Sequence, residues 1–207
     1  MEITKNTYQL IGGEFSDTRD RIWPEMKSLV KKYVKAGDKV LDVCCGNGRL
    51  VEILPAVDYL GVDSSEVLLK RNKNKTRKLD ILELDKLEGG FDIVFCFASF
   101  NHVASKELRL KVLSDIKELL KPKGLLIMTN WNMWQRGVKK SIWKSKRIGF
   151  KDVMTVWQSG DGKKSGQIYY RAFTRGELKR LFKKSGFGIL ENYLSENKRN
   201  IVTVGRS

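Results

Sequence analysis

Short apolar runs recur along the first two thirds of this 207-residue chain and predict buried strands. The predicted strands are Val40–Val43, Tyr59–Val62, Phe91–Phe97 and Leu125–Thr129. Between them lie helical patterns, the clearest in the segment SKELRLKVLSDIKELL. Its apolar residues recur at three- and four-residue steps and so share one helix face. They are Leu108, Val112, Leu113, Ile116, Leu119 and Leu120.

Pro122 and Gly124 follow this helix and turn the chain into the next strand. Strands that alternate with helices predict an α/β fold with a doubly wound, Rossmann-like and mostly parallel sheet. Near the end of the chain, Thr174 and Glu177 form a capping-box pattern and Gly186 is the predicted C-cap. The last two segments, Gly188–Tyr193 and Asn200–Val204, are predicted closing strands, paired antiparallel.

The pattern breaks down between Trp131 and Gln167, which predicts an insertion over the ligand-binding edge of the sheet. We expect one domain over residues 1–207, with an N-terminal helical cap at 1–36 and a basic, Trp-rich insertion at 131–168. In the cap, Trp23 and Pro24 are predicted to begin the first helix.

Composition indicates a basic globular protein. Hydrophobic residues make up 41% and charged residues 31%, and the formal net charge is +16. Such an excess favours polyanionic partners, above all nucleic acid. We find no apolar run long enough for a bilayer and no secretory signal, and three cysteines without metal-site spacing argue against a disulfide framework. We therefore expect a cytoplasmic protein without a membrane partner.

The stretch VLDVCCGNGRL, residues 40–50, predicts a ligand-binding turn between a strand and a helix that begins near Asn47. Gly46 and Gly48 allow close backbone approach. A dinucleotide fingerprint would need a third glycine at position 51, where the chain has Val51. The glycines alone are weak evidence, and the dinucleotide interpretation loses ground.

Three acidic residues at predicted strand ends change the picture. Asp42 closes the first strand, where a carboxylate would repel a pyrophosphate but suit an ammonium or sulfonium group. Asp63 closes the second strand, where a carboxylate typically binds ribose hydroxyls. Asp80 falls where a third strand should end and would orient a base. A ligand with a cation, a ribose and a base but no phosphate fits this set, and S-adenosylmethionine is such a ligand.

At this point the sequence resembles the class I S-adenosylmethionine-dependent methyltransferases over nearly its whole length. Their motif, hydrophobic-L-D-x-G-x-G-x-G, is matched by Leu41, Asp42, Gly46 and Gly48, with Cys44 in place of the first glycine. GGFDIVFCFASFNHVAS resembles their fourth strand and LLKPKGLLIMTNWN their fifth. The resemblance implies S-adenosylhomocysteine as product. The predicted cofactor-binding residues are Asp42, Cys44, Gly46, Asn47, Gly48, Asp63, Ser64, Asp80, Ile81, Phe97 and Ala98.

Two segments resemble one group more closely. FSDTRDRIWPEM has the pattern F-S-x-T-R-x-x-x-W-P, and DVMTVWQ with QIYYRAFTRGEL is similar to D-V-x-x-x-W and R-Y-Y-H-x-F-x-x-G-E-L. These patterns belong to the tRNA wobble-uridine carboxymethyl methyltransferases, which convert the carboxylate of 5-carboxymethyluridine to a methyl ester. The chain departs from the last pattern at Ile168 and Arg171. The resemblance implies tRNA as a partner and, as a further candidate, a small zinc-binding activator subunit.

The residues suit this chemistry. A carboxylate acceptor is ionised at neutral pH because its ordinary pKa is about 4, so no general base is required. The chain has a single histidine and no metal-binding cluster. The predicted catalytic residues are Arg19, His102, Tyr170 and Arg171. The predicted RNA-binding residues are Trp131, Trp134, Lys139, Lys140, Lys144, Lys146 and Arg147.

Two alternatives stay open at this level. A methyltransferase for a small molecule or another acceptor would work without RNA. A non-catalytic RNA-binding scaffold with the same fold would not bind S-adenosylmethionine.

Overall fold

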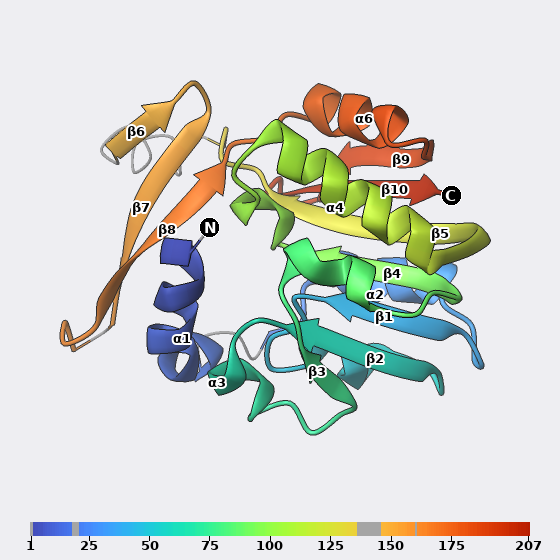
Figure 1. Cartoon of the computed structure of the whole chain (residues 1–207), viewed down its shortest axis with the longest axis horizontal. Helices are drawn as coiled ribbons and strands as arrows, with labels where there is room; N and C mark the ends of the chain where they lie inside the picture. The colour runs from blue at the N-terminus through green and yellow to red at the C-terminus, as the bar shows by residue number, and fades with distance from the viewer. Residues whose placement is uncertain (1, 18–20, 136–145, 160) are drawn as a thin grey trace.

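The computed structural model describes residues 2–17, 21–135, 146–159 and 161–207 (Figure 1). The helices are α1 (Glu2–Asp17), α2 (Pro24–Tyr33), α3 (Glu66–Leu69), α4 (Lys106–Leu119) and α6 (Arg175–Lys184), with short 3-10 helices η1 (Arg49–Ile53), η2 (Ile81–Lys86) and η3 (Phe100–His102). The strands are β1 (Lys39–Val43), β2 (Asp58–Asp63), β3 (Thr76–Lys78), β4 (Phe91–Phe97), β5 (Leu120–Trp131), β6 (Lys146–Gly149), β7 (Asp152–Gln158), β8 (Ser165–Arg171), β9 (Gly188–Leu194) and β10 (Asn200–Arg206).

The described residues form a large sheet with the strand order β3-β2-β1-β4-β5-β10-β9. Strands β1 to β5 pair parallel with one another, and β10 lies antiparallel to both β5 and β9. The reversal of chain order between β1 and β4 creates the crevice in which such sheets bind ligands. The predicted doubly wound sheet and its antiparallel closing pair are confirmed.

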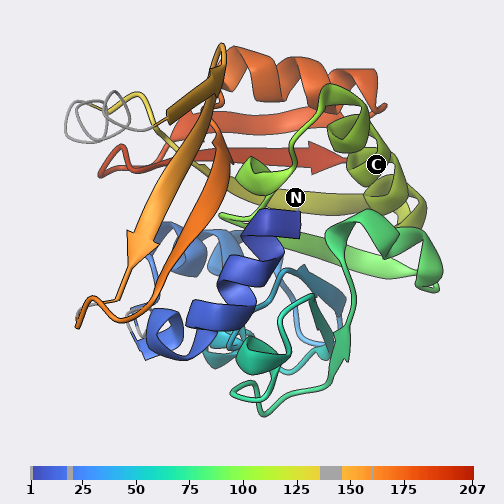
Figure 2. The same cartoon turned by 60° about the vertical axis from the view of Figure 1, so that its left-hand side comes forward.

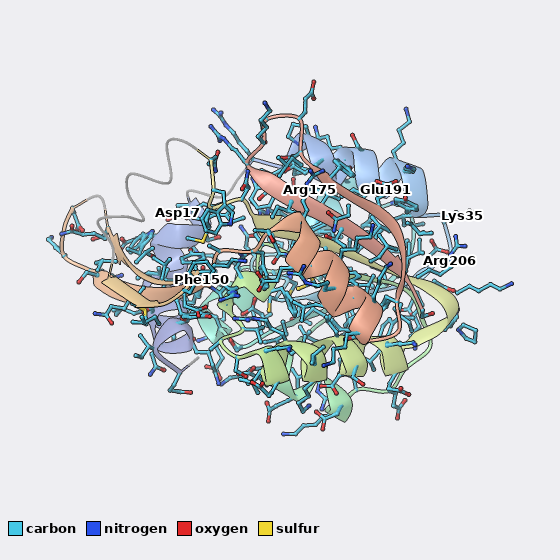
Figure 3. All side chains as sticks on the ribbon, turned by 90° about the horizontal axis from the view of Figure 1, so that it is seen from above. Asp17, Lys35, Phe150, Arg175, Glu191 and Arg206 are labelled. Carbon is cyan, nitrogen blue, oxygen red and sulfur yellow. The ribbon has the colours of Figure 1, made fainter. Side chains whose placement is uncertain are left out.

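Apolar side chains bury both faces of this sheet. Along β1, Val40 packs with α2, whereas Leu41 and Val43 pack in the cluster that contains α4 and α6. This alternation follows the two-residue period of a strand. Figure 3 shows α4 and α6 side by side on the second of these faces. Thr174 caps α6 by accepting a hydrogen bond from the Glu177 amide, and Gly186 follows α6 with φ +78°, as predicted.

Two local predictions are wrong. The helix expected near Asn47 is the 3-10 helix η1, which begins at Arg49 after Gly48, a residue in the left-handed conformation. Trp23 and Pro24 begin α2 and not the first helix, because α1 precedes them. The sequence of α1 carries a glycine pair and few strongly apolar positions, which hid its helical period.

The segment in which the α/β pattern breaks down contains regular structure that the sequence did not predict. Strands β6, β7 and β8 form a small antiparallel sheet, separate from the large one. Figures 1 and 2 show α1 lying between this small sheet and α3. The Thr7 hydroxyl donates to the carbonyl of Gln167 at 2.8 Å, and the Tyr169 amide donates to Thr4 at 3.0 Å, which fixes α1 against β8.

Candidate active site

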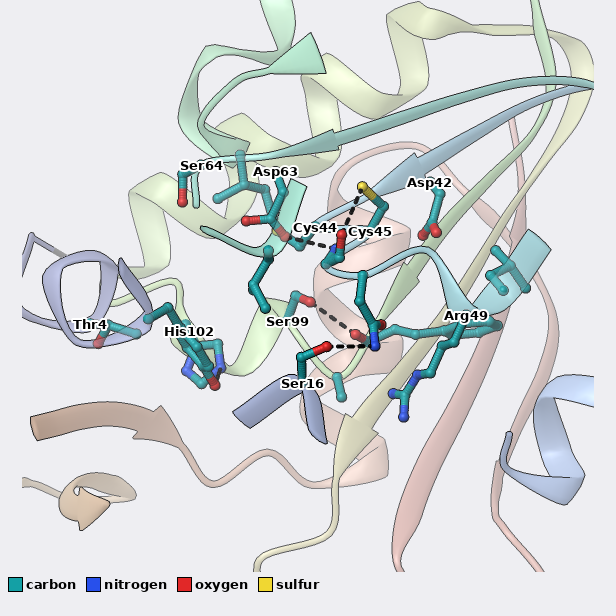
Figure 4. A pocket seen from close by; sticks show the side chains of 18 of the residues that line it. Thr4, Ser16, Asp42, Cys44, Cys45, Arg49, Asp63, Ser64, Ser99 and His102 are labelled. Carbon is teal, nitrogen blue, oxygen red and sulfur yellow. Dashed lines mark hydrogen bonds between the residues drawn. The ribbon is translucent and has the colours of Figure 1, made fainter. Parts of the chain in front are cut away.

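A pocket opens at the carboxyl ends of β1, β2 and β4, and α1 forms one of its walls (Figure 4). This is the edge at which the crevice of a doubly wound sheet accepts ligands. Most of the predicted cofactor and acceptor residues converge here. Those that line the pocket are Asp42, Cys44, Gly46, Asn47, Asp63, Ser64, Asp80, Ile81, Phe97, Ala98, His102, Trp131 and Tyr170.

Other predicted residues lie elsewhere. Gly48, Trp134 and Arg171 are described but do not line the pocket. Arg19, Lys139, Lys140 and Lys144 fall outside the described residues, as do the side chains of Lys146 and Arg147.

The two glycines of the turn, Gly46 and Gly48, differ in what surrounds them. Both have positive φ, +56° at Gly46 and +82° at Gly48. The nearest described atom to a Cβ on Gly46 would be a Leu68 methyl carbon 4.0 Å away, so this backbone faces open space in the pocket. A Cβ on Gly48 would lie 2.4 Å from the side-chain oxygen of Asn72. Gly48 is therefore required by packing, and Gly46 leaves room for a ligand.

Cys44 occupies a backbone position that favours glycine. Its φ is +59°, a left-handed conformation that costs a non-glycine residue about 1 kcal/mol or more. Burial raises the pKa of the Cys44 thiol well above its ordinary value, so it stays protonated at neutral pH. The side chain is a neutral part of the pocket wall.

Asp42 is an almost buried carboxyl group with 4% exposure. The Tyr59 hydroxyl donates a hydrogen bond to it at 3.2 Å. Burial raises the pKa of Asp42 to about 7, an effect that the Tyr59 hydrogen bond and the charge of Arg49 reduce without cancelling it. A cationic ligand group beside Asp42 would favour its ionised form.

Asp63 is held rigidly at the end of β2. The Gly46 amide donates to one carboxylate oxygen at 3.0 Å, and the Ser65 amide donates to the other at 2.9 Å. Burial raises its pKa, although these amides oppose the shift. The hydrogen bond from the Gly46 amide joins the Asp63 carboxylate at the end of β2 to the glycine turn after β1.

Asp80 has a partner that the sequence did not reveal. The Leu82 amide donates to one oxygen at 2.9 Å, and Lys5 Nζ lies 2.8 Å from the other. The hydrogen bond to Asp80 raises the pKa of Lys5. Helix α1 thus brings a cation to the third acidic strand end.

Helix α1 is the largest part of the site that the sequence analysis missed. Thr4, Lys5, Tyr8 and Ser16 from this helix line the pocket, and Asn47 donates to the Ser16 hydroxyl at 2.9 Å. Trp23 and Arg49 also line it, with the Arg49 guanidinium 4.4 Å from the Trp23 ring centroid. Arg49 directly follows the glycine turn in the sequence, and this position could have identified it as a pocket residue.

Four aromatic side chains, which we call the aromatic wall, form another side of the pocket. They are Tyr8, His102, Trp131 and Tyr170. The Trp131 and Tyr170 rings are stacked, with centroids 5.5 Å apart, and the His102 ring lies 4.7 Å from Tyr170. Tyr8 meets His102 edge-on at 5.5 Å. An aromatic surface of this kind suits an unstacked base.

His102 is a neutral member of this wall. Its Nδ1 lies 2.8 Å from the carbonyl oxygen of Tyr169, so Nδ1 carries the proton, and Nε2 accepts from the Tyr8 hydroxyl at 3.2 Å. Burial lowers the pKa of His102 to about 4. His102 is therefore neutral at pH 7, and its two hydrogen bonds link Tyr8 of α1 to the backbone of β8.

Arg171 does not lie in the pocket, where its predicted catalytic role would require it. Its guanidinium forms ion pairs with Glu177 and Asp152, at 2.8 and 3.2 Å, on the opposite side of β8 from Tyr170. Trp134 likewise serves packing, since its indole N–H donates to the carbonyls of Ala172 and Phe173. For Arg171 the physical reason is strand alternation, which sends the neighbouring side chains of Tyr170 and Arg171 to opposite sides of β8.

Two features are absent from the part of the chain that the structure describes. No group of three or more His, Cys, Asp or Glu side chains is arranged to hold a metal ion. No described helix has both the length and the apolar character that a bilayer crossing requires.

A family model described as "Methyltransferase domain" matches residues 14–192. The chain belongs to this methyltransferase family. Among solved structures, the methyltransferase fold is shared with a SAM-dependent methyltransferase from Methanosarcina mazei, with a TM-score of 0.71 and 16% identity over 90% of this chain and 98% of that one. The DhpI–SAM–HEP complex has a TM-score of 0.74 and 16% identity over 100% of this chain and 96% of that one.

Curated relatives share sequence with the chain. The tRNA (carboxymethyluridine(34)-5-O)-methyltransferase of Schizosaccharomyces pombe is 26% identical, covering 92% of this methyltransferase chain and 91% of its own. The mouse probable tRNA methyltransferase 9B is 26% identical over 73% of this chain and 33% of its own. The Arabidopsis thaliana tRNA (carboxymethyluridine(34)-5-O)-methyltransferase is 28% identical over 60% of this chain and 31% of its own. The chain spans about a third of the length of the first curated relatives it matches.

Proposed function

We propose that this protein is a cytoplasmic S-adenosylmethionine-dependent methyltransferase that acts on tRNA. Its acceptor is the carboxylate of 5-carboxymethyluridine at the wobble position, which becomes a methyl ester. The observation that carries the proposal is the meeting of three strand-end carboxylates with an aromatic wall in one pocket. The likeness to the Schizosaccharomyces pombe relative over nearly both chains supports this choice of acceptor.

The residues present suit the methyl donor. Asp42 is buried and accepts from the neutral Tyr59 hydroxyl, so a cationic ligand group would complement it. Asp63 is oriented by two backbone amides and would accept from ribose hydroxyls, while Asp80 and Ile81 would flank the base. The open space at Gly46 leaves room beside the backbone. When bound, S-adenosylmethionine supplies a methyl group activated by its sulfonium.

The protein's own part in the reaction is alignment. A carboxylate acceptor needs no proton removed, and His102 with a pKa of about 4 and two engaged nitrogens removes none. The aromatic wall would hold the base while the acidic strand ends hold the donor. Restricting both partners in this way lowers the barrier by proximity and orientation. The positive net charge of +16 supports association with the phosphates of tRNA.

An activator subunit stays a prediction. Ile3 and Leu10 are exposed apolar residues on α1, at 53% and 52% exposure, whereas the edge strand β3 exposes Arg77 and Lys78. Co-purification of the chain with a candidate subunit, followed by assays with and without it, would test this part.

The deciding experiment uses tRNA from cells that lack the enzyme. The protein is incubated with this tRNA and methyl-labelled S-adenosylmethionine, and the nucleosides are identified by mass spectrometry after digestion. We expect a labelled methyl ester on a wobble uridine, lost in an Asp63→Asn variant. Label on a ring nitrogen or a ribose oxygen would refute the acceptor. Absence of S-adenosylhomocysteine binding at millimolar concentration would favour a scaffold.

A further inference from the structure

Four charged side chains from four separate elements meet behind the aromatic wall. We call them the charge network: Arg109 of α4, Asp152 of β7, Arg171 of β8 and Glu177 of α6. Arg171 Nε donates to Glu177 at 2.9 Å, and Arg171 also donates to both oxygens of Asp152 at 3.2 Å. Arg109 has 4% exposure and its guanidinium lies 3.8 Å from Asp152.

Tyr169 joins this network to the strand that carries the wall. Its hydroxyl donates to Asp152 at 2.5 Å and accepts from Arg109 at 2.9 Å. Asp152 therefore receives bonds from two β8 side chains, Tyr169 and Arg171, which share one side of the strand. Tyr170 points to the other side, into the pocket.

Backbone contacts carry this arrangement to the rest of the wall. The Tyr169 carbonyl accepts from the His102 ring at 2.8 Å. The Arg171 carbonyl accepts from the Asn101 side chain at 2.9 Å, and the oxygen of that side chain accepts from the Trp131 amide at 2.9 Å. Asn101 is fully buried. The residues on either side of Tyr170 thus bind the segments that carry His102 and Trp131.

We propose that Asp152 is a positioning residue for the methyl acceptor, because it locks β8 so that Tyr170, His102 and Trp131 form one rigid wall. The acceptor role of the wall rests on the proposed function. Asp152 does not line the pocket, so its effect is transmitted through Tyr169 and Arg171. Removing one partner from a partly buried ion network weakens the whole network, because the remaining charges stay buried without an opposite charge beside them. The two arginines would then no longer hold β8 in one place.

The test compares Asp152→Ala, Asp152→Asn and Tyr169→Phe with wild type. Asp161→Ala is the matched control, since Asp161 is an exposed acid in the turn between β7 and β8 that contacts Ser159 and the Lys163 amide. For each protein, kcat and KM for tRNA and Kd for S-adenosylhomocysteine are measured. We expect kcat to fall by about 10- to 100-fold in Asp152→Ala, as misplacement of a reactant predicts. The Kd should stay within about twofold, and Asp152→Asn should lie between, since its amide oxygen still accepts from Tyr169.

A spectroscopic measurement separates positioning from activity. The chain has one histidine, so NMR titration of its imidazole reports on His102 alone. Its ring contacts Tyr8, Tyr170 and the backbone carbonyl of Tyr169, none of which is a carboxylate or a cation. In wild type the pKa is about 4. A loosened wall admits water, so the pKa should rise toward the ordinary value of about 6.5 in Asp152→Ala and Tyr169→Phe.

Each outcome decides the matter. An unchanged kcat and an unchanged His102 titration in folded variants would overturn the proposal. So would a loss of S-adenosylhomocysteine affinity parallel to kcat, because that indicates general destabilisation. If Asp152→Ala does not fold, Tyr169→Phe decides, since it removes a single hydroxyl. If wild type methylates no tRNA, the proposed function fails, and the His102 titration still tests whether Asp152 holds the wall.

Discussion

The donor side and the aromatic wall of the pocket are built in different ways. On the donor side, Asp42, Gly46 and Asp63 belong to one strand–turn–strand unit, joined by a hydrogen bond across 17 positions of the chain. In the wall, the hydrogen bond from Tyr8 to His102 spans 94 positions, and Tyr170 comes from a second sheet. Local units leave a readable motif in a sequence, whereas a surface assembled from distant segments depends on how those segments pack. The two sides should therefore respond separately to mutation.

The largest effect is expected from Asp63→Ala. This change removes the carboxylate that accepts from the Gly46 and Ser65 amides and would bind the ribose. Hydrogen bonds to a charged group contribute about 1.5–3 kcal/mol each, so affinity for S-adenosylhomocysteine should fall about 100-fold or more. Isothermal titration calorimetry measures it. Asp58→Ala, at the exposed start of the same strand, is the control and should bind as wild type does.

On the other side, Trp131→Ala should reduce kcat/KM for tRNA by about 10- to 100-fold, because stacking on a base contributes about 1–3 kcal/mol. Affinity for S-adenosylhomocysteine should not change. Trp134→Ala is the matched control, since Trp134 holds the carbonyls of Ala172 and Phe173 outside the pocket. It should lower Tm and leave kcat/KM per folded molecule unchanged. Equal losses of donor affinity in Trp131→Ala would show that the two sides are not separate.

The affinity of the donor side for its ligand is expected to depend on pH. Asp42 has a pKa of about 7, and a bound cation favours its ionised form. Binding of S-adenosylhomocysteine should strengthen about tenfold from pH 6 to pH 8, as the ionised fraction grows. The same raised pKa makes the free energy of unfolding fall as pH rises toward 7. Calorimetry at several pH values checks the binding, and a slope that persists in Asp42→Asn would assign it to another group.

The smallest effect concerns Cys44. Glycine adopts its φ of +59° without strain, so Cys44→Gly should raise stability by up to about 1 kcal/mol, or about 2–4 °C in Tm. The equivalent change at Cys45, which is buried and has no positive φ, should lower Tm. Differential scanning calorimetry compares the two. A lower Tm for Cys44→Gly would mean that the thiol contributes more by packing than the backbone loses by strain.

The sequence predicted the donor side of the pocket better than the aromatic wall. The apolar runs marked β1, β2, β4 and β5, because strands buried on both faces need continuous apolar sequence. Asp42 and Asp63 were found because strand ends of a parallel sheet share one edge. Arg171 was assigned to the acceptor, yet it pairs with Asp152 and Glu177. The sequence around Arg171 would look the same whether this arginine binds the acceptor or forms ion pairs. Only its partners in the folded structure distinguish the two roles.

By itself, the sequence determined the doubly wound sheet, the glycine turn and the acidic strand ends, because each follows from periodicity or from chain neighbours. Only the tertiary structure decided that α1 closes the pocket with Lys5 and Tyr8, that His102 is held neutral, and that the insertion forms a second sheet carrying Tyr170. These features arise from contacts between segments far apart in the chain. Their free energy comes from burial and hydrogen bonding that exist only after the chain has folded.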